Sequence, residues 1–169
     1  MPLITPQDLL AANKSLKYLG GKCTALFILR ILGFGRLNRD YDKYNNLKGS
    51  AFLSKLTDIY GLNFELPPDD LKKIPEKGPF IIISNHPTGA AEGIFLIKIF
   101  SDKRPDFKFL SNFLLDRIEP MKEYFLGVNP FENRKDLQSS FAGIKNALEH
   151  VKSGAPLGIF PAGEVSAYQ

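Results

Sequence analysis

Short apolar runs and helically spaced apolar positions alternate along this chain. From residue 80 onward, four apolar runs have the length of β-strands: 80–84, 107–110, 125–128 and 156–160. Apolar residues at helical spacing occupy the stretch from Ile94 to Ser101, between the first two of these runs. A strand, a helix and a strand in this order form a βαβ unit, whose strands pair in parallel. We therefore predict an α/β fold, with a mostly parallel central sheet flanked by helices and with the first strand buried.

The clearest helical pattern lies between the last two runs. There, apolar residues follow one another in steps of four and three: Leu137, Phe141, Ile144, Leu148 and Val151. This spacing predicts an amphipathic helix over 137–152, which Ser153-Gly154 would close. The stretch 111–124 predicts one or two short helices broken by Pro120.

Three helical segments precede the first strand: 7–19, 22–32 and 48–60. Thr5-Pro6 suits the start of the first helix, because Thr can cap a helix and Pro fits its first turn. Gly20-Gly21 separates the first two helices, which therefore form a hairpin, and Gly61 ends the third. A loop rich in Pro and charge, 66–79, leads to the first strand.

Length and composition fit a globular protein. The 169 residues, 44% hydrophobic and 24% charged, suit one domain. We expect the amphipathic helices of 1–60 and the N-terminal portion of an α/β domain, 61–169, to form one structural unit. Because the chain stops after a strand and a turn, we also expect a truncated domain with further sheet beyond Gln169. The single cysteine, Cys23, excludes an internal disulfide and predicts a small buried side chain.

Positive charge is concentrated near the N-terminus. Residues 1–60 hold nine Lys or Arg and four acidic residues, whereas 61–169 hold thirteen basic and fourteen acidic residues. This asymmetry indicates an anionic partner, either nucleic acid or anionic lipid. The basic residues are not interleaved with a platform of aromatic residues that would stack on bases, so we expect no nucleic-acid partner.

The apolar segment 22–32 is too short to span a bilayer. It suits the membrane interface, where Arg30, Arg36 and Arg39 would meet lipid headgroups. A hairpin that packs on the protein core explains the same pattern, and the two alternatives are compatible.

Polar residues gather where three of the predicted strands end: Asn85-His86 with Glu92, Asn129-Pro130-Phe131 with Arg134, and Phe160-Pro161-Ala162-Gly163-Glu164. The carboxyl ends of parallel strands meet at one edge of a sheet, where ligands of open α/β sheets bind. A histidine at this edge can act as a general base. A nearby carboxylate can orient its ring and stabilise its charged form.

Each of these residues also has a structural interpretation. Taken alone, His86 is most often a hydrogen-bonded histidine at a strand end, and Glu92 is most often an acid at a helix N-terminus. Arg134 alone is usually a solvated surface charge. The combination of His86 and Glu92 around a glycine turn nevertheless favours catalysis. His150, near the end of the 137–152 helix, suits a capping or dipole role.

Other kinds of site are poorly supported. One cysteine and two histidines far apart in the chain form no structural zinc motif. The chain contains no glycine motif for dinucleotides or phosphates and no serine nucleophile elbow. We expect no metal and no cofactor.

The strand-end clusters, in this order, resemble the motifs of the glycerolipid acyltransferases, the group that includes 1-acylglycerol-3-phosphate acyltransferase. That family carries Asn-His followed by an acid, and later Phe-Pro-Glu-Gly-Thr-Arg-Ser. The most similar subgroup comprises bacterial proteins labelled hemolysin-like or lyso-ornithine-lipid acyltransferases, with Asn-His-Pro-Leu-Gly-Gly-Leu-Asp-Gly and Phe-Pro-Ala-Gly-Glu. This chain has Asn-His-Pro-Thr-Gly-Ala-Ala-Glu-Gly over 85–93 and Phe-Pro-Ala-Gly-Glu-Val-Ser over 160–166.

The resemblance implies an enzyme that moves a fatty acyl group from acyl-CoA or acyl-carrier protein to the hydroxyl of a lysolipid or aminolipid acceptor. It makes His86 the general base and Glu92 the acid that orients it. The residues implied in substrate binding are Asn85, Arg134, Phe160, Pro161, Gly163 and Glu164. It also implies a peripheral protein on the cytoplasmic face of the cell membrane, bound through the basic N-terminal helices.

Three features depart from the family pattern. Five residues separate His86 from Glu92 where four are commonest, and the acid is Glu where the subgroup mostly has Asp. Ala162 stands where the broad family has Glu, a residue linked to glycerol-phosphate acceptors. An aminolipid acceptor therefore fits the chain at least as well as lysophosphatidic acid. A non-catalytic lipid-binding or membrane-tethering module is the alternative function.

Overall fold

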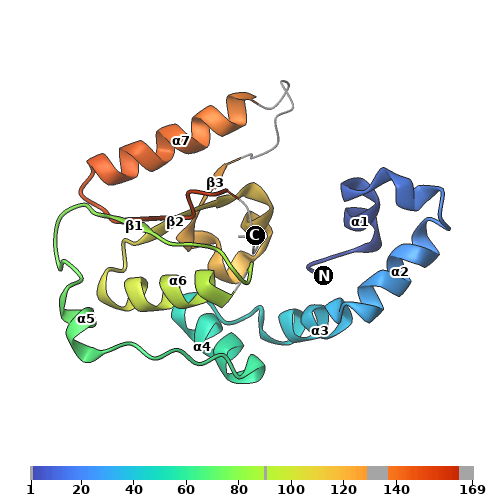
Figure 1. The fold of residues 1–169 in the computed structure, drawn as a ribbon, viewed down its shortest axis with the longest axis horizontal. Helices are drawn as coiled ribbons and strands as arrows, with labels where there is room; N and C mark the ends of the chain where they lie inside the picture. The colour runs from blue at the N-terminus through green and yellow to red at the C-terminus, as the bar shows by residue number, and fades with distance from the viewer. Residues whose placement is uncertain (1, 90, 129–136, 164–169) are drawn as a thin grey trace. The chain divides into compact units, whose positions relative to one another are not determined.

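A computed structural model describes residues 2–89, 91–128 and 137–163 of the chain. Two compact units make up the chain, Met1–Asn46 and Leu47–Gln169. The first unit consists of helices, and the second contains the β-sheet (Figure 1).

The helices of the first unit are α1 (Pro6–Ala12), the 3₁₀-helix η1 (Lys14–Lys17), α2 (Lys22–Ile31) and α3 (Phe34–Tyr44). The predicted start of α1 is confirmed, because Thr5 and Asp8 form a reciprocal capping box. The single helix predicted over 7–19 is wrong. Asn13 is extended, and its side-chain oxygen accepts the N–H of Ser15 at 3.0 Å, which competes with continuation of the helix.

Helix α2 confirms the helix predicted over 22–32, whereas α3 was not predicted. Ala25 and Leu29 form the buried side of α2. The large apolar residues of α2 that remain exposed are Leu26, Phe27 and Ile31. Cys23 is also exposed, so the prediction of a buried cysteine is wrong. The reason is its position, one turn before the exposed Phe27 on the outer side of the helix.

The second unit is built on a sheet of four strands: β1 (Ile81–Ile83), β2 (Lys108–Asn112), β3 (Phe125–Val128) and β4 (Leu157–Ile159). The strand order is β1-β4-β2-β3, and every neighbouring pair is parallel. This confirms the predicted α/β fold with a parallel sheet. The first and second strands are not neighbours, however, because β4 lies between them.

Helices cover both faces of this sheet (Figure 1). Helix α7 (Leu137–Lys152) lies on one face and α6 (Ala91–Lys103) on the other, where α6 also contacts α4 (Gly49–Tyr60). These three helices confirm segments predicted as helical. The largest fully buried side chains of the unit are Phe52, Leu53, Phe107 and Pro156.

Helix α7 approaches the sheet through small residues. Gly143 and Ala147 are buried, and a Cβ atom at Gly143 would overlap the carbonyl oxygen of Gly127 in β3. The described large residues of its predicted apolar stripe point away from the sheet: Phe141, Ile144 and Leu148 are all exposed. The stripe thus predicts the helix correctly, although smaller residues make the contact with the sheet.

Strand β1 lies at an edge of the sheet, so the prediction of a buried first strand is wrong. Ile81 and Ile83 are 52% and 67% exposed, while Ile82 between them is half-buried. The physical reason is that α7 contacts β3 and β4, so the outer isoleucines of β1 have no covering layer among the described residues.

Three short helices complete the unit: α5 (Pro68–Lys72), and the 3₁₀-helices η2 (Phe113–Arg117) and η3 (Glu119–Tyr124). Helix α5 lies within the stretch predicted as a loop. The two 3₁₀-helices confirm the short helices predicted over 111–124, but the break between them is at Ile118 and not at Pro120 as predicted. Pro120 stands in the first turn of η3, where a proline is well tolerated.

A buried arginine ties together the segments that enter the sheet. The Arg104 side chain is almost fully buried, and it donates to the carbonyl oxygens of Gly78 at 2.8 Å and Gly154 at 3.2 Å. It also forms a two-point ion pair with Asp106, at 2.9 and 2.7 Å. The hydrogen bonds from Arg104 lower the pKa of Asp106. Arg104 therefore fixes the chain before β1, β2 and β4.

Candidate active site

The candidate site lies where β1 and β4 leave the sheet. Ile83 pairs with Ile159, and the N–H of Ser84 still donates to the Ile159 carbonyl at 3.3 Å. Because these strands are parallel neighbours, the residues that follow them emerge side by side. The rings of His86 and Phe160 are in fact stacked, with centroids 4.0 Å apart and planes inclined by 15°.

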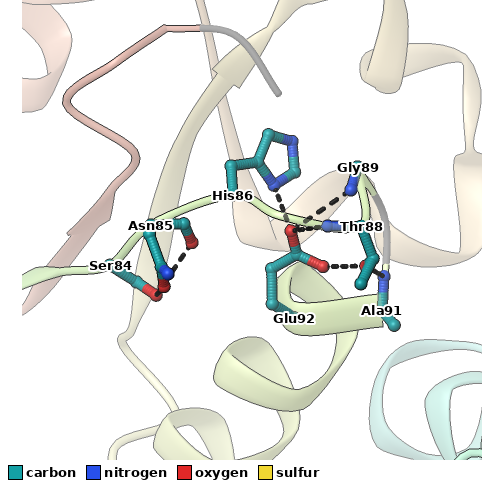
Figure 2. A network of polar contacts seen from close by, with 7 residues as sticks. All are labelled: Ser84, Asn85, His86, Thr88, Gly89, Ala91 and Glu92. Atoms are coloured by element: carbon teal, nitrogen blue, oxygen red, sulfur yellow. Dashed lines mark hydrogen bonds and ion pairs between the residues drawn. The ribbon is translucent and has the colours of Figure 1, made fainter. Parts of the chain in front are cut away.

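Glu92 reaches His86 from the first turn of α6. The distance from His86 Nδ1 to Glu92 Oε1 is 2.8 Å, as Figure 2 shows. Both side chains are largely buried, with exposed fractions of 19% and 15%. The five-residue spacing that departs from the family pattern is therefore compatible with direct contact between the histidine and the acid.

The turn between these two residues holds the Glu92 carboxylate with further donors. The backbone N–H groups of Thr88 and Gly89 donate to Oε1, at 2.9 and 3.2 Å, and the Thr88 hydroxyl donates to Oε2 (Figure 2). The Thr88 oxygen in turn accepts the N–H of Ala91 at 3.2 Å. Gly89 has a φ of +81°, a left-handed conformation that glycine adopts without strain.

These donors set the charge of Glu92. Burial acts to raise the pKa of its carboxyl group. Hydrogen bonds from the Thr88 hydroxyl and from the N–H groups of Glu92, Thr88 and Gly89 outweigh burial and lower the pKa to about 2. At neutral pH the carboxylate is therefore ionised and can only accept hydrogen bonds.

The ionised carboxylate determines which imidazole nitrogen carries a proton. Since Glu92 can only accept, the 2.8 Å contact requires an N–H at His86 Nδ1. In the neutral imidazole the basic lone pair then belongs to Nε2. Figure 2 shows Nε2 on the side of the ring that points away from Glu92. This is the tautomer that a histidine general base needs.

The other predicted site residues are placed as follows. Asn85 is exposed and lies beside Ser84, whose hydroxyl donates to the Asn85 carbonyl at 3.0 Å (Figure 2). Pro161 and Gly163 are exposed in a turn that the Gly163 N–H closes on the Phe160 carbonyl at 3.0 Å. The structure therefore brings Phe160 to the His86–Glu92 pair. Arg134 and Glu164 lie outside the described residues.

Two contributors to the site were missed by the sequence analysis. Thr88 had a recognisable signal, because a threonine just before a helix, followed closely by Glu, is typical of a helix cap. Phe109 had none. Its ring lies 4.7 Å from that of Phe160, and this contact depends on the pairing of β2 with β4, which local patterns do not reveal.

No group of three or more metal-ligating side chains occurs among the described residues. In the same part of the chain, no helix has the length and apolar character needed to cross a bilayer. Comparison with known proteins adds one finding: the family model described as Acyltransferase matches residues 69–168. No curated protein and no solved structure matches the chain.

The matched segment covers more than half of the chain and includes all four strands of the sheet. It also includes His86, Glu92 and Phe160, the three residues that meet at the candidate site. The chain belongs to the acyltransferase family.

Proposed function

We propose that this protein transfers a fatty acyl group from an acyl thioester to the hydroxyl of a lipid acceptor, with His86 as general base. The observation that supports this most strongly is the 2.8 Å contact between His86 Nδ1 and the ionised carboxylate of Glu92. This contact directs the basic lone pair of His86 to Nε2, in a side chain that keeps partial access to solvent.

In the proposed reaction, His86 removes a proton from the acceptor and later gives it to the leaving group. His86 Nε2 takes the proton of the acceptor hydroxyl as its oxygen attacks the thioester carbonyl carbon, and a carbon–oxygen bond forms. Collapse of the tetrahedral intermediate breaks the carbon–sulfur bond, and the imidazolium returns the proton to the departing sulfur. Glu92 stabilises the imidazolium between these two steps. Backbone N–H groups in the turn after Phe160 are candidates for stabilising the oxyanion.

The resemblance described above supports a lysolipid or aminolipid as acceptor, and acyl-CoA or acyl-carrier protein as donor. Ala162, in place of the glutamate linked to glycerol-phosphate acceptors, favours an aminolipid acceptor of the kind used by the lyso-ornithine-lipid acyltransferases. We propose this acceptor class first and lysophosphatidic acid second.

The first unit supports a location at the membrane surface. It carries seven Lys or Arg and three acidic residues, so it holds the entire net charge of +4. On α2, exposed Leu26, Phe27 and Ile31 lie on either side of exposed Arg30. A helix of this kind lies in the interface, with its apolar residues among the acyl chains and its cation at the anionic headgroups. We propose peripheral binding at the cytoplasmic face.

Acyl transfer can be tested directly with purified protein and vesicles. The assay would offer acyl-CoA or acyl-carrier protein as donor, and lyso-ornithine lipid or lysophosphatidic acid as acceptor. We expect transfer by the wild-type chain with at least one pair, and near-complete loss in His86→Ala. His150→Ala is the matched control, because it removes the only other histidine and should leave transfer intact.

Two outcomes would reject the catalytic proposal. Undiminished transfer by a folded His86→Ala variant would show that His86 is not the base. Vesicle binding that is unaffected by His86→Ala, without transfer from either donor, would favour the alternative of a membrane-tethering module. The exposed apolar residues of α2 are the observation that supports this alternative.

A further inference from the structure

A continuous column of aromatic rings connects His86 with the core of the second unit. The imidazole lies flat against the Phe160 ring, with the centroids 4.0 Å apart and the planes at 15°. Phe160 contacts Phe109 at 4.7 Å, and Phe109 contacts Phe107 edge-on at 6.3 Å. Phe107 and Phe109 are buried, so the inner end of this column is packed in the protein core.

The base of the column depends on a glycine in β4. Gly158 pairs with Phe109 in the sheet, and a Cβ atom at Gly158 would lie 2.5 Å from Phe109 Cδ2 and 2.8 Å from Phe107 Cζ. Real atoms do not approach so closely, so a side chain at Gly158 would displace both rings. The absence of a side chain at Gly158 leaves room for the Phe109 ring to lie across β4 and contact the Phe160 ring.

Glu92 and Phe160 constrain the imidazole in different ways. The carboxylate holds the ring edge at Nδ1, and this contact alone permits the ring plane to rotate about the Nδ1–Oε1 axis. The Phe160 ring contacts the imidazole face and opposes this rotation. Together the two contacts fix both the position of Nε2 and the direction of its lone pair.

We infer that Phe160 is a positioning residue, whose ring fixes the plane of the His86 imidazole and stabilises its charged form during acyl transfer. This inference rests on the proposed function. It differs from the role in substrate binding that the sequence resemblance implies for Phe160. An aromatic face also attracts a cation. The ring therefore favours the imidazolium that forms when His86 takes the proton.

The test uses kinetics of Phe160→Leu, which keeps an apolar side chain but removes the flat ring. We expect kcat to fall about 10- to 100-fold, with KM for the acceptor within about twofold, because misorientation of a base affects the chemical step. Phe160→Tyr keeps the ring and should restore kcat.

Phe80→Leu is the matched control for the loss of a ring. Phe80 is half-buried beside the sheet, precedes β1, and has its own aromatic partner, Phe100, at 6.0 Å. The Phe80→Leu variant should lose stability to a similar degree without a change in kcat. A rise in KM alone for Phe160→Leu would overturn the inference, because it would assign the ring to acceptor binding. An equal loss of kcat in Phe80→Leu would do so too.

A second measurement decides the inference even if no acyl transfer is found. The chain has two histidines, so the imidazole proton signals of His86 are readily assigned by NMR with the help of His86→Ala. Stacking on Phe160 should shift these signals upfield in the wild type and in Phe160→Tyr, and the shift should vanish in Phe160→Leu. Unchanged signals in Phe160→Leu would overturn the positioning role. Absence of transfer by the wild type would reject only the proposed function.

Discussion

The two histidines of this chain lie near opposite ends of the parallel strands, His86 after β1 and His150 beside the residue before β4, and their partners differ. His86 follows β1 and pairs through Nδ1 with a carboxylate, Glu92, at 2.8 Å. His150 lies near the end of α7, and its Nε2 is 3.1 Å from the carbonyl oxygen of Pro156, the residue that precedes β4. A carboxylate stabilises the charged form of an imidazole far better than a single carbonyl does. The direct hydrogen-bond partner therefore distinguishes the two histidines: a carboxylate at His86 and a backbone carbonyl at His150.

The polar groups around the two histidines show the same contrast. At the amino ends of the strands, the Arg104 guanidinium donates hydrogen bonds to backbone carbonyl oxygens and so holds the chain segments together. After the strands, backbone N–H groups of Thr88 and Gly89 gather on a carboxylate, which still accepts from His86. The Arg104 guanidinium is paired with Asp106 and with backbone carbonyl oxygens, so this arrangement has a structural role. The arrangement around Glu92 presents a titratable group at the edge where α/β proteins bind ligands.

The largest expected difference between the two ends of the strands is in acyl-transfer activity. His86→Ala should lower kcat for acyl transfer about 100- to 10,000-fold, the usual contribution of a general base. His150→Ala should leave kcat within about twofold and instead lower the free energy of unfolding by about 1 kcal/mol, because the Pro156 carbonyl loses one of its two donors and keeps only the Lys108 N–H. Acyl-transfer kinetics and urea denaturation of both variants check this. A similar loss of activity in both variants would contradict the assignment of roles.

The amino ends of the strands, where Arg104 lies, should contribute more to the free energy of unfolding than the His86 site does. Arg104→Met should lower the free energy of unfolding by about 3 kcal/mol, because it removes a buried cation that serves a carboxylate and several carbonyl groups. Urea denaturation measures the change, and the neighbouring exposed Lys103→Met is the matched control, with an effect below about 0.5 kcal/mol. Equal stability of the two variants would show that Arg104 does not hold the sheet entrance.

Thr88 offers a smaller test on the side of the site. Thr88→Ala removes the hydroxyl that donates to Glu92, so kcat should fall about tenfold, the value of one hydrogen bond to a charged group. Thr88→Ser keeps the hydroxyl and should retain most of the activity. Steady-state kinetics of the pair decide the matter. Equal rates for the two variants would exclude a contribution from the hydroxyl.

The smallest expected effect is the dependence of stability on pH. The pKa of Glu92 is lowered from 4.5 to about 2, so its contribution is present above pH 4.5 and is lost as the pH falls from about 4.5 to about 2. The lowered pKa of Asp106 gives a contribution of the same sign at the amino ends of the strands. In urea denaturation at several pH values, Glu92→Gln and Asp106→Asn should each flatten part of this acid loss. An unchanged slope in Glu92→Gln would contradict the strong hydrogen bonding of its carboxylate.

Local sequence patterns predicted much of the secondary structure and the central pair of the site. The apolar runs located all four strands, and the spacing of apolar residues located α4, α6 and α7. His86 and Glu92 were recognised because strand, turn and helix follow one another directly in the chain. Local periodicity is sufficient for such features, since the residues involved are close in sequence.

Features set by long-range pairing escaped the sequence analysis. Strand β1 is an edge strand of the sheet and α7 contacts β3 and β4, so Ile81 and Ile83 are exposed, although an uninterrupted apolar run suggested burial. The contact of Phe160 with Phe109 depends on the same strand order. Helix α7 is a second example. It packs on the sheet at Gly143, because only a residue without a side chain leaves room for the Gly127 backbone of β3. The apolar pattern of the helix does not show how closely a strand distant in sequence will approach it.

The contact that matters most is the hydrogen bond that the His86 Nδ1–H donates to the Glu92 carboxylate, which makes Nε2 the basic nitrogen. A long-range proton–nitrogen NMR correlation spectrum of the imidazoles measures this tautomer directly, with His86→Ala for assignment. We predict that neutral His86 carries its proton on Nδ1. A spectrum showing the proton of neutral His86 on Nε2 would contradict a hydrogen bond from Nδ1 to Glu92 and the role of His86 as general base.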